Sequence, residues 1–93
     1  MNQTNDKYFI ALSDHLKQLM ELKGIDISDL AAAANLDRKQ IYRFLNKENI
    51  PKLSTIVKIS LAAGIEPQQL FDFKFNFKAY MAENNIFPIK DNS

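Results

Sequence analysis

The stretch ISDLAAAANLDRKQIYRFLNKENIP, residues 27–51, decides the fold of this chain of 93 residues. Its run of alanines has side chains small enough for another helix to approach closely, which predicts a short helix crossing a neighbour. Asn35 stands where this helix must turn, and asparagine tolerates left-handed backbone geometry. Asp37 can then cap another helix from about Arg38 to Leu45. The stretch therefore predicts two short helices joined by a tight turn.

Each of these two helices is expected to have a buried side. In the first, Asp26 or Ser28 can cap the helix, and burial begins at Leu30. In the second, helical spacing separates an apolar side from a basic and amide-bearing side. The residues expected to face inward there are Ile41, Phe44 and Leu45, and those expected to face outward are Arg38, Lys39, Gln40, Tyr42, Arg43 and Asn46.

The outward side of the second helix has the chemistry of a DNA-reading surface. The major groove offers acceptors on guanine to arginine or lysine, and a donor and acceptor pair on adenine to glutamine or asparagine. Positive charge is also concentrated here, because residues 35–52 carry five basic and two acidic residues, whereas the whole chain has a net charge of only +1. A basic helix face is often only a solvated surface. The tight turn and the cap beside it favour a helix-turn-helix that binds double-stranded DNA.

The segments on both sides of this stretch are also predicted to be helical. From Tyr8 to Lys23, apolar residues recur at steps of three and four, and Gly24 can end that helix. The segment LSTIVKISLAAG, residues 53–64, predicts a fourth helix that ends in glycine. A last helical turn is expected in EPQQLF, where Pro67 suits the first helical position.

Composition limits the classes of protein that the chain can represent. Its length suits one domain, and the absence of cysteine excludes disulfides and thiolate metal sites and fits the cytoplasm. No signal peptide or membrane span is visible. The single histidine, His15, is expected on a partly exposed helix surface, and its neighbours diverge around the helix, so no catalytic relay forms. We expect no enzyme, no metal, no cofactor and no small-molecule ligand.

The segment FDFKFNF, residues 71–77, differs from everything before it. Phenylalanine occupies every second position, and such alternation predicts a half-buried β-strand. IFPIK, residues 86–90, could form a second short strand, confined to an edge by Pro88. Three partners are open to the first strand: this second strand, the same strand of another protomer, or the sheet of a different protein. We favour pairing between protomers, with the phenylalanines covering the fourth helix near Leu61.

The order of elements from Phe9 to Phe71 resembles the lambda-repressor-like family, the Cro/repressor or XRE type of helix-turn-helix found in many small bacterial regulators. Leu30 and Ala31 stand at the family's paired Leu-Ala, and residues 65–70 at its closing signature. The resemblance implies an all-α fold of five helices, to which the chain would add the C-terminal strand or hairpin. Ile27 departs from the pattern, since the family often has a phosphate-bonding glutamine there.

The resemblance also implies residue roles. Tyr42 could stack on a base or a thymine methyl, or only cover its own helix. Main-chain N–H groups at the start of the first short helix would favour a phosphate, because the helix dipole is positive there. The base-reading positions would be Arg38, Lys39, Tyr42 and Arg43, and the phosphate-contacting ones Ile27, Ser28, Gln40, Asn46, Lys47 and Lys52.

These observations predict a transcriptional regulator, of repressor type by its resemblance, that reads a pseudo-palindromic DNA site through the major groove as a homodimer. Residues 1–7 would be a flexible N-terminus, residues 8–71 the DNA-binding domain and residues 72–93 a dimerisation element. The residues expected at the dimer interface are Phe73, Phe75, Phe77 and Leu61. The alternative is a protein-interaction module, such as an antitoxin-like partner or an adaptor that does not bind DNA and uses the C-terminal strand.

Overall fold

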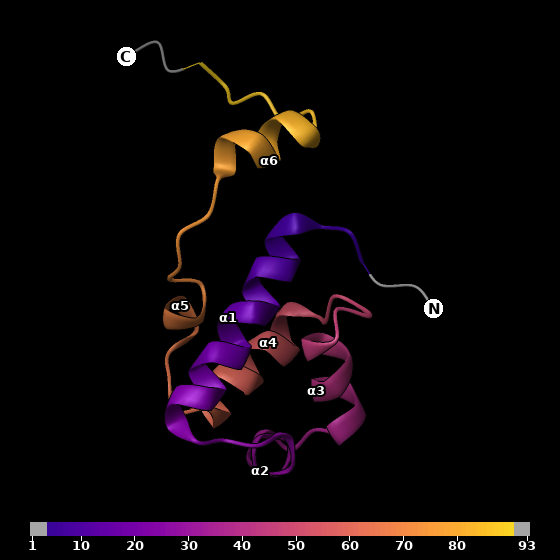
Figure 1. Ribbon diagram of the computed structural model, residues 1–93, viewed down its shortest axis with the longest axis vertical. Coiled ribbons are helices and arrows are strands. Elements are labelled where there is room, and N and C mark those ends of the chain that lie inside the picture. The colour runs from indigo at the N-terminus through magenta and orange to yellow at the C-terminus, as the bar shows by residue number, and fades with distance from the viewer. Residues whose placement is uncertain (1–3, 91–93) are drawn as a thin grey trace.

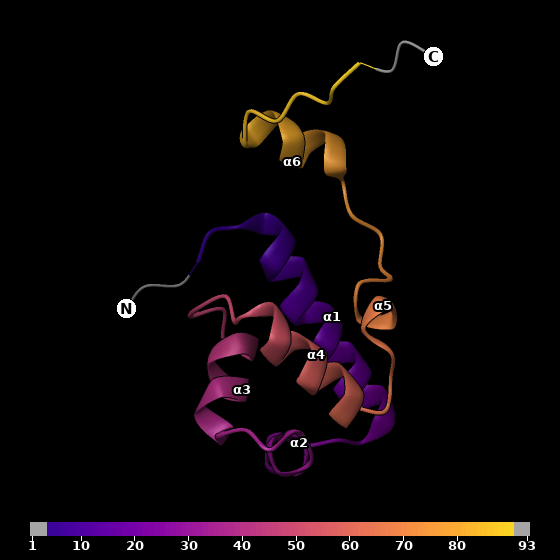
Figure 2. The same ribbon diagram turned by 180° about the vertical axis from the view of Figure 1, so that it is seen from behind.

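The computed structural model describes residues 4–90, and this part of the chain is entirely helical (Figure 1). The predicted helix-turn-helix is present with the predicted bounds for its second helix. In both views α3 and α5 lie on opposite sides of α1 and α4, and α2 lies across one end of this group (Figures 1 and 2). The helices are α1 (Lys7–Lys23), α2 (Ile27–Ala34), α3 (Arg38–Leu45), α4 (Leu53–Ala62), α5 (Pro67–Leu70) and α6 (Phe77–Glu83).

One hydrophobic core joins α1 to α5. Helix α2 packs against α3 and α4, and α1 packs against α3 and α5. Of the four alanines of α2, Ala31 and Ala34 are buried at this crossing, whereas Ala32 and Ala33 are exposed. The largest fully buried apolar side chains are Leu16, Leu30, Ile41, Phe44, Ile59 and Leu70. Because every one of the five helices contributes to this core, none of them can move independently of the rest.

The turn between α2 and α3 depends on side-chain caps and one left-handed residue. Asp26, one of the two predicted candidates, caps α2 by accepting a hydrogen bond from the Asp29 amide at 2.8 Å. Asn35 ends α2 with a φ of 57°, as its position predicted. Asp37 caps α3 and forms a reciprocal pair of hydrogen bonds with Gln40. These contacts satisfy helix-end groups that would otherwise lack partners, and they fix the angle between the two helices.

The prediction of a C-terminal strand from FDFKFNF is wrong. Residues 71–76 form irregular turns, and Phe77 already belongs to α6. The backbone bonds to itself instead of to another strand: the Phe73 amide donates to the Phe71 carbonyl, and the Phe77 amide to the Phe75 carbonyl, both at 3.1 Å. IFPIK is not a strand either, because residues 86–90 have no regular secondary structure. A hairpin is therefore also excluded within the described residues.

The alternating phenylalanines surround one aromatic ring of α1. Tyr8 has Phe73 at 5.3 Å and Phe75 at 4.9 Å between ring centroids, and Phe71 and Phe77 lie slightly farther away. The expected contact with the fourth helix is replaced by this contact with the first. The four phenylalanine side chains can converge on Tyr8 because the local turns bend the backbone around its ring. In a strand, these alternate residues would instead lie in a row along one face.

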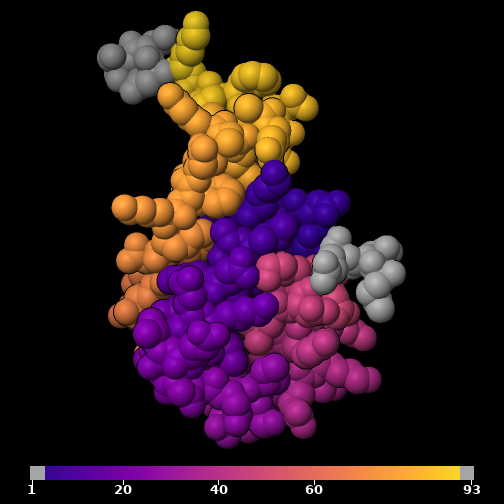
Figure 3. All heavy atoms as spheres, viewed as in Figure 1, coloured from indigo at the N-terminus to yellow at the C-terminus, as the bar shows by residue number. Residues whose placement is uncertain are grey.

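A second contact fixes α6 to the start of α1. The Asp6 carboxylate caps α1 by accepting from the Phe9 amide at 2.9 Å, and its other oxygen accepts the Tyr80 hydroxyl at 2.7 Å. Lys7 and Glu83 add an exposed ion pair at 3.4 Å. In Figure 3 the orange and yellow C-terminal segment accordingly lies at the indigo end of the molecule. Helix α6 buries no residue of its own, so these few contacts hold it.

His15 takes the structural position that the sequence predicted. It is half-buried, its Nδ1 lies 2.7 Å from the Leu70 carbonyl oxygen, and its ring contacts Phe73. The residues 4–90 contain no cluster of side chains that could hold a metal ion. Over the same range, no helix has the length and apolar character that crossing a membrane demands.

Two leucines of α1 provide a test of the core. Leu16 is fully buried, whereas Leu22 on the same helix is 83% exposed. We expect Leu16→Ala to lower the free energy of unfolding by about 2–5 kcal/mol, since it opens a cavity. Leu22→Ala should change it by less than about 0.5 kcal/mol. Urea denaturation measures both, and equal effects of the two substitutions would contradict the arrangement of α1.

The Asp6 contact predicts an acid-sensitive attachment of α6. Burial raises the pKa of Asp6, but hydrogen bonds from Tyr80 and from the Phe9 and Tyr8 amides outweigh it, so the pKa lies below its ordinary 3.8. A carboxyl whose pKa is lowered by folding stabilises the folded form above its unfolded pKa and loses this effect as the pH falls through the folded value. We therefore expect the contact with Tyr80 to weaken below about pH 4.

An NMR titration of the Tyr80 ring resonances checks this expectation. In the wild type they should shift with an apparent pKa below 3.8. Asp6→Ser provides the matched control, because serine also caps helices but does not titrate. If the same acid shift persisted in Asp6→Ser, the carboxylate would not be the group responsible.

Candidate nucleic-acid interface

The exposed side of α3 carries all the side chains that were predicted to read bases. Arg38, Lys39, Tyr42 and Arg43 are exposed, and Tyr42 keeps 55% of its surface accessible although it is aromatic. These residues fall at helical spacings of one, three and four, so they share one side of a two-turn helix. A cationic side with one aromatic ring in its middle therefore faces outward from the fold.

The inward side of α3 determines where this exposed side lies. Phe44 is fully buried and stacks on Phe9 of α1, with ring centroids 5.3 Å apart and an interplanar angle of 17°. Ile41 is also fully buried, and Leu45 is nearly so. Rotation of α3 about its axis would expose these three apolar side chains to water and is therefore unfavourable. The outward residues therefore have a fixed direction, which recognition of base edges requires.

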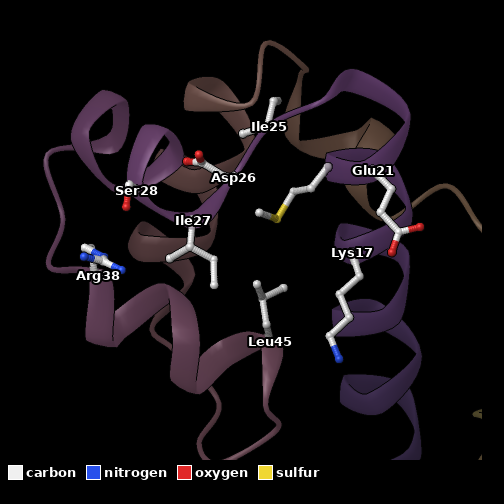
Figure 4. Close-up of a pocket in the computed structure, with 9 residues that line it drawn as sticks. Lys17, Glu21, Ile25, Asp26, Ile27, Ser28, Arg38 and Leu45 are labelled. Carbon is white, nitrogen blue, oxygen red and sulfur yellow. The ribbon is translucent and has the colours of Figure 1, made fainter.

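A hollow of about 340 Å³ lies between the start of α2 and α3. It is lined by Ile27, Arg38, Lys39 and Tyr42, so one apolar side chain sits among two cations and an aromatic ring. A larger hollow of about 460 Å³ continues toward α1 (Figure 4). There, Ile27 lies between Arg38 and Leu45, and Lys17 of α1 approaches from the opposite wall. The side chain of Ile27 thus forms part of two adjoining surfaces.

A separate hollow of about 390 Å³ lies between the end of α3 and the start of α4. Its polar lining comes from Gln40, Arg43, Asn49, Lys52 and Thr55. Lys52 is exposed at the N-cap position of α4 and makes no side-chain cap bond. Two of the predicted phosphate contacts, Gln40 and Lys52, are therefore brought together beside Arg43. This arrangement suits an anionic backbone passing between the two helices.

Two other predicted phosphate contacts are engaged within the chain. The Lys47 ammonium lies 2.8 Å from the Asp14 carboxylate, and only 20% of this lysine side chain is exposed. Lys47 also has a left-handed φ of 60°. Asn46 is half-buried and donates to Glu48 at 2.6 Å. Both residues thus stabilise the end of α3 in the free protein.

One candidate contact was missed by the sequence analysis. Lys17 of α1 lines a hollow of about 180 Å³ together with Ile27, Tyr42, Leu45 and Asn46. Nothing in the local sequence marks Lys17, which is one exposed lysine on a helix with an apolar face. Only the packing of α1 against α3 brings it beside the exposed side of α3. Ser28 of α2, another predicted phosphate contact, is exposed and lines the larger hollow.

Comparison with known protein families matches residues 15–76 to the Cro/C1-type HTH DNA-binding domain, which is more than half of the chain. The chain belongs to the Cro/C1-type helix-turn-helix family. The resemblance stated from the sequence is therefore confirmed, and with it the assignment to DNA-binding regulators of this type. The Cro/C1-type match ends at residue 76, so α6 lies beyond the matched residues.

A solved structure supports the same fold. The crystal structure of the restriction-modification controller protein C.AhdI from Aeromonas hydrophila matches this Cro/C1-type chain with a TM-score of 0.64 and 28% identity. The match covers 68% of this chain and 96% of that one. A search of curated proteins finds no significant match.

Proposed function

We propose that this protein is a transcriptional regulator that recognises a pseudo-palindromic DNA site through the major groove. The observation that carries this proposal is the exposed cationic side of α3, held in one direction by the buried Ile41 and Phe44. The similarity to C.AhdI, whose structure is described as that of a controller protein, supports a regulatory role.

Within this proposal, the first and last turns of α3 read bases. Arg38 and Arg43 can each present a two-pronged guanidinium to the O6 and N7 acceptors of guanine. Lys39 can donate a hydrogen bond to one acceptor on a base edge. Tyr42, which lies between the two arginines on the helix, can contact a base face or edge. The two arginines are five residues apart along the helix, so they would reach different base pairs of one half-site.

Contacts with phosphate would surround this base-reading side. Lys52 and Gln40 lie beside Arg43, and Ser28 stands in the first turn of α2, at the positive end of the helix dipole. The main-chain amide of Ile27 belongs to the same turn. Lys47 would exchange its partner Asp14 for a phosphate oxygen, and Asn46 would act from the end of α3. These contacts would position the protein without selecting sequence.

We also propose that the protein binds DNA as a homodimer. One short recognition helix reads only a few base pairs, and two related by a twofold axis read two half-sites about one helical turn apart. Strand pairing no longer provides the interface. Leu61 of α4 is 60% exposed and Phe77 of α6 is 55% exposed, so both have apolar surface available for a partner. Phe73 and Phe75 are half-buried on Tyr8, and their part is to hold α6 in place.

The second candidate function is a protein-interaction module that does not read DNA. The observation that favours it is the set of exposed apolar side chains after α6, namely Ile86, Phe87 and Ile89. Addition of a strand to a foreign sheet is no longer its motivation, because the strand is absent from the described residues. The cationic side of α3 has no role in this alternative, and for that reason we prefer DNA recognition.

Selection of DNA sites from a random pool by the purified protein distinguishes these functions. We expect enrichment of a motif with two related half-sites about one helical turn apart. Recovery of no motif, together with a stoichiometric protein partner in pull-down, would favour the interaction module.

Two variants then separate base reading from phosphate binding on the selected site. Arg43→Ala should lose about 1–3 kcal/mol of discrimination at one position of each half-site. Lys52→Ala should weaken all sequences equally and reduce the salt dependence by about one unit of slope per protomer. If Arg43→Ala discriminated as well as the wild type, Arg43 would not read a base.

Two exposed leucines test the dimer. We expect Leu61→Lys to dissociate the dimer, since an unpaired charge in an apolar interface is unfavourable, and to weaken binding to a two-half-site DNA. Leu22→Lys introduces the same charge at another exposed leucine, one with no assigned role, and should leave the dimer and the DNA affinity unchanged. Sedimentation velocity measures the assembly. A dimer that survived both Leu61→Lys and Phe77→Lys would place the interface elsewhere.

A further inference from the structure

The hollow between α2 and α3 has both cationic and apolar groups in its lining. Its lining consists of Ile27, Arg38, Lys39 and Tyr42. A cationic wall attracts a negatively charged partner, whereas the isoleucine side chain can neither donate nor accept a hydrogen bond. An occupant that fits both must be anionic overall and must present an apolar group at this point.

The position of Ile27 makes its apolar surface available beside α3. It is the first residue of α2, and its side chain is half-buried, so part of it stays accessible. Figure 4 shows the side chain directed into the space between α3 and α1, with Arg38 on one side and Leu45 on the other. Tyr42, one turn after Arg38, borders the same hollow. The accessible part of Ile27 is therefore next to the two α3 residues that we assign to base reading.

Duplex DNA satisfies both requirements with one chemical group. Its backbone is anionic, and among the base edges in the major groove the apolar group is the methyl on carbon 5 of thymine, which 5-methylcytosine also carries. Burying a methyl group against isoleucine and a tyrosine ring is favourable in proportion to the area removed from water. A phosphate in the same place would leave the isoleucine surface with no favourable contact.

We propose that Ile27 and Tyr42 form a specificity pocket for a pyrimidine 5-methyl group, beside a guanine read by Arg38. This proposal rests on the proposed function, because it assigns a further determinant to the same DNA-reading surface. The side chain of Ile27 then acts in base discrimination, in addition to the phosphate contact assigned to its main-chain amide. Each half-site contains one position at which the methyl group, and not only the hydrogen-bonding pattern of the base pair, determines affinity.

Replacement of thymine by uracil isolates this effect, because uracil keeps the same hydrogen-bonding groups and lacks only the methyl. With the site obtained by selection, each thymine is replaced in turn in a synthetic duplex. At one position per half-site, we expect affinity to fall by about fourfold, the value for one buried methyl group. At other thymines, the change should be close to none.

Three variants connect the effect to Ile27. Ile27→Ala should lose most of the affinity difference between the thymine and uracil duplexes, because only Tyr42 would then border the methyl group, whereas Ile27→Val, which keeps apolar bulk, should preserve most of the difference. Ile25→Ala is the matched control: Ile25 is also a half-buried isoleucine and lines the larger hollow, but it does not line the hollow that Ile27 shares with Tyr42, so the fourfold difference should persist. Circular dichroism confirms that each variant is folded.

A further duplex distinguishes the two sources of the methyl group. Cytosine is placed at the sensitive position, with and without 5-methylation. Tighter binding of the methylated duplex shows that the methyl alone is recognised. No gain from methylation, with the thymine effect intact, restricts the pocket to thymine.

The outcomes separate this proposal from the proposed function. A selected site that tolerates uracil at every thymine overturns the methyl pocket and leaves DNA recognition in place. A uracil effect of the same size in Ile27→Ala also overturns it, since another residue would then contact the methyl. Selection that enriches no site contradicts the proposed function itself.

Discussion

The stack of Phe44 on Phe9 is the contact on which the rest of this structure depends. It fixes the second helix of the helix-turn-helix against the longest helix of the chain, with both rings almost entirely removed from water. Because α3 has only eight residues, it has little stability of its own and takes its position from this burial. The positions of the cationic side, of the hollows that border it and of Tyr42 all follow from how the buried side of α3 is held.

Much of this arrangement could be predicted from the sequence because it depends on local chemistry. Asp37 and Asn35 define the turn through their own capping bonds and backbone preferences, and both act as predicted. Burial of Ile41, Phe44 and Leu45 followed from helical spacing, which needs no knowledge of what they contact. For the same reason, five residues predicted to face outward are exposed, namely Arg38, Lys39, Gln40, Tyr42 and Arg43, whereas Asn46 at the end of the helix is half-buried.

The failures concern contacts between residues that are distant in sequence. The alternation in FDFKFNF predicted a strand, but a strand needs a neighbouring strand with which to form hydrogen bonds. The described part of the chain offers these phenylalanines contacts with the ring of Tyr8 instead. The pairing of Lys47 with Asp14, thirty-three positions away, could not be read from spacing. The side-chain environment of Ile27 depends in the same way on where α1 and α3 meet. Periodicity indicates which side is buried, and only the fold indicates what covers it.

The aromatic cluster around Tyr8 has a practical consequence for studying this protein. The chain has three tyrosines and no tryptophan, so its intrinsic fluorescence comes from tyrosine alone. Tyr8 and Tyr80 belong to the attachment of the C-terminal helix, whereas Tyr42 lies on the exposed side of α3. Replacement of either group by phenylalanine leaves an emission signal from the other. The molecule thus contains separate optical probes for its two ends, and neither requires a label.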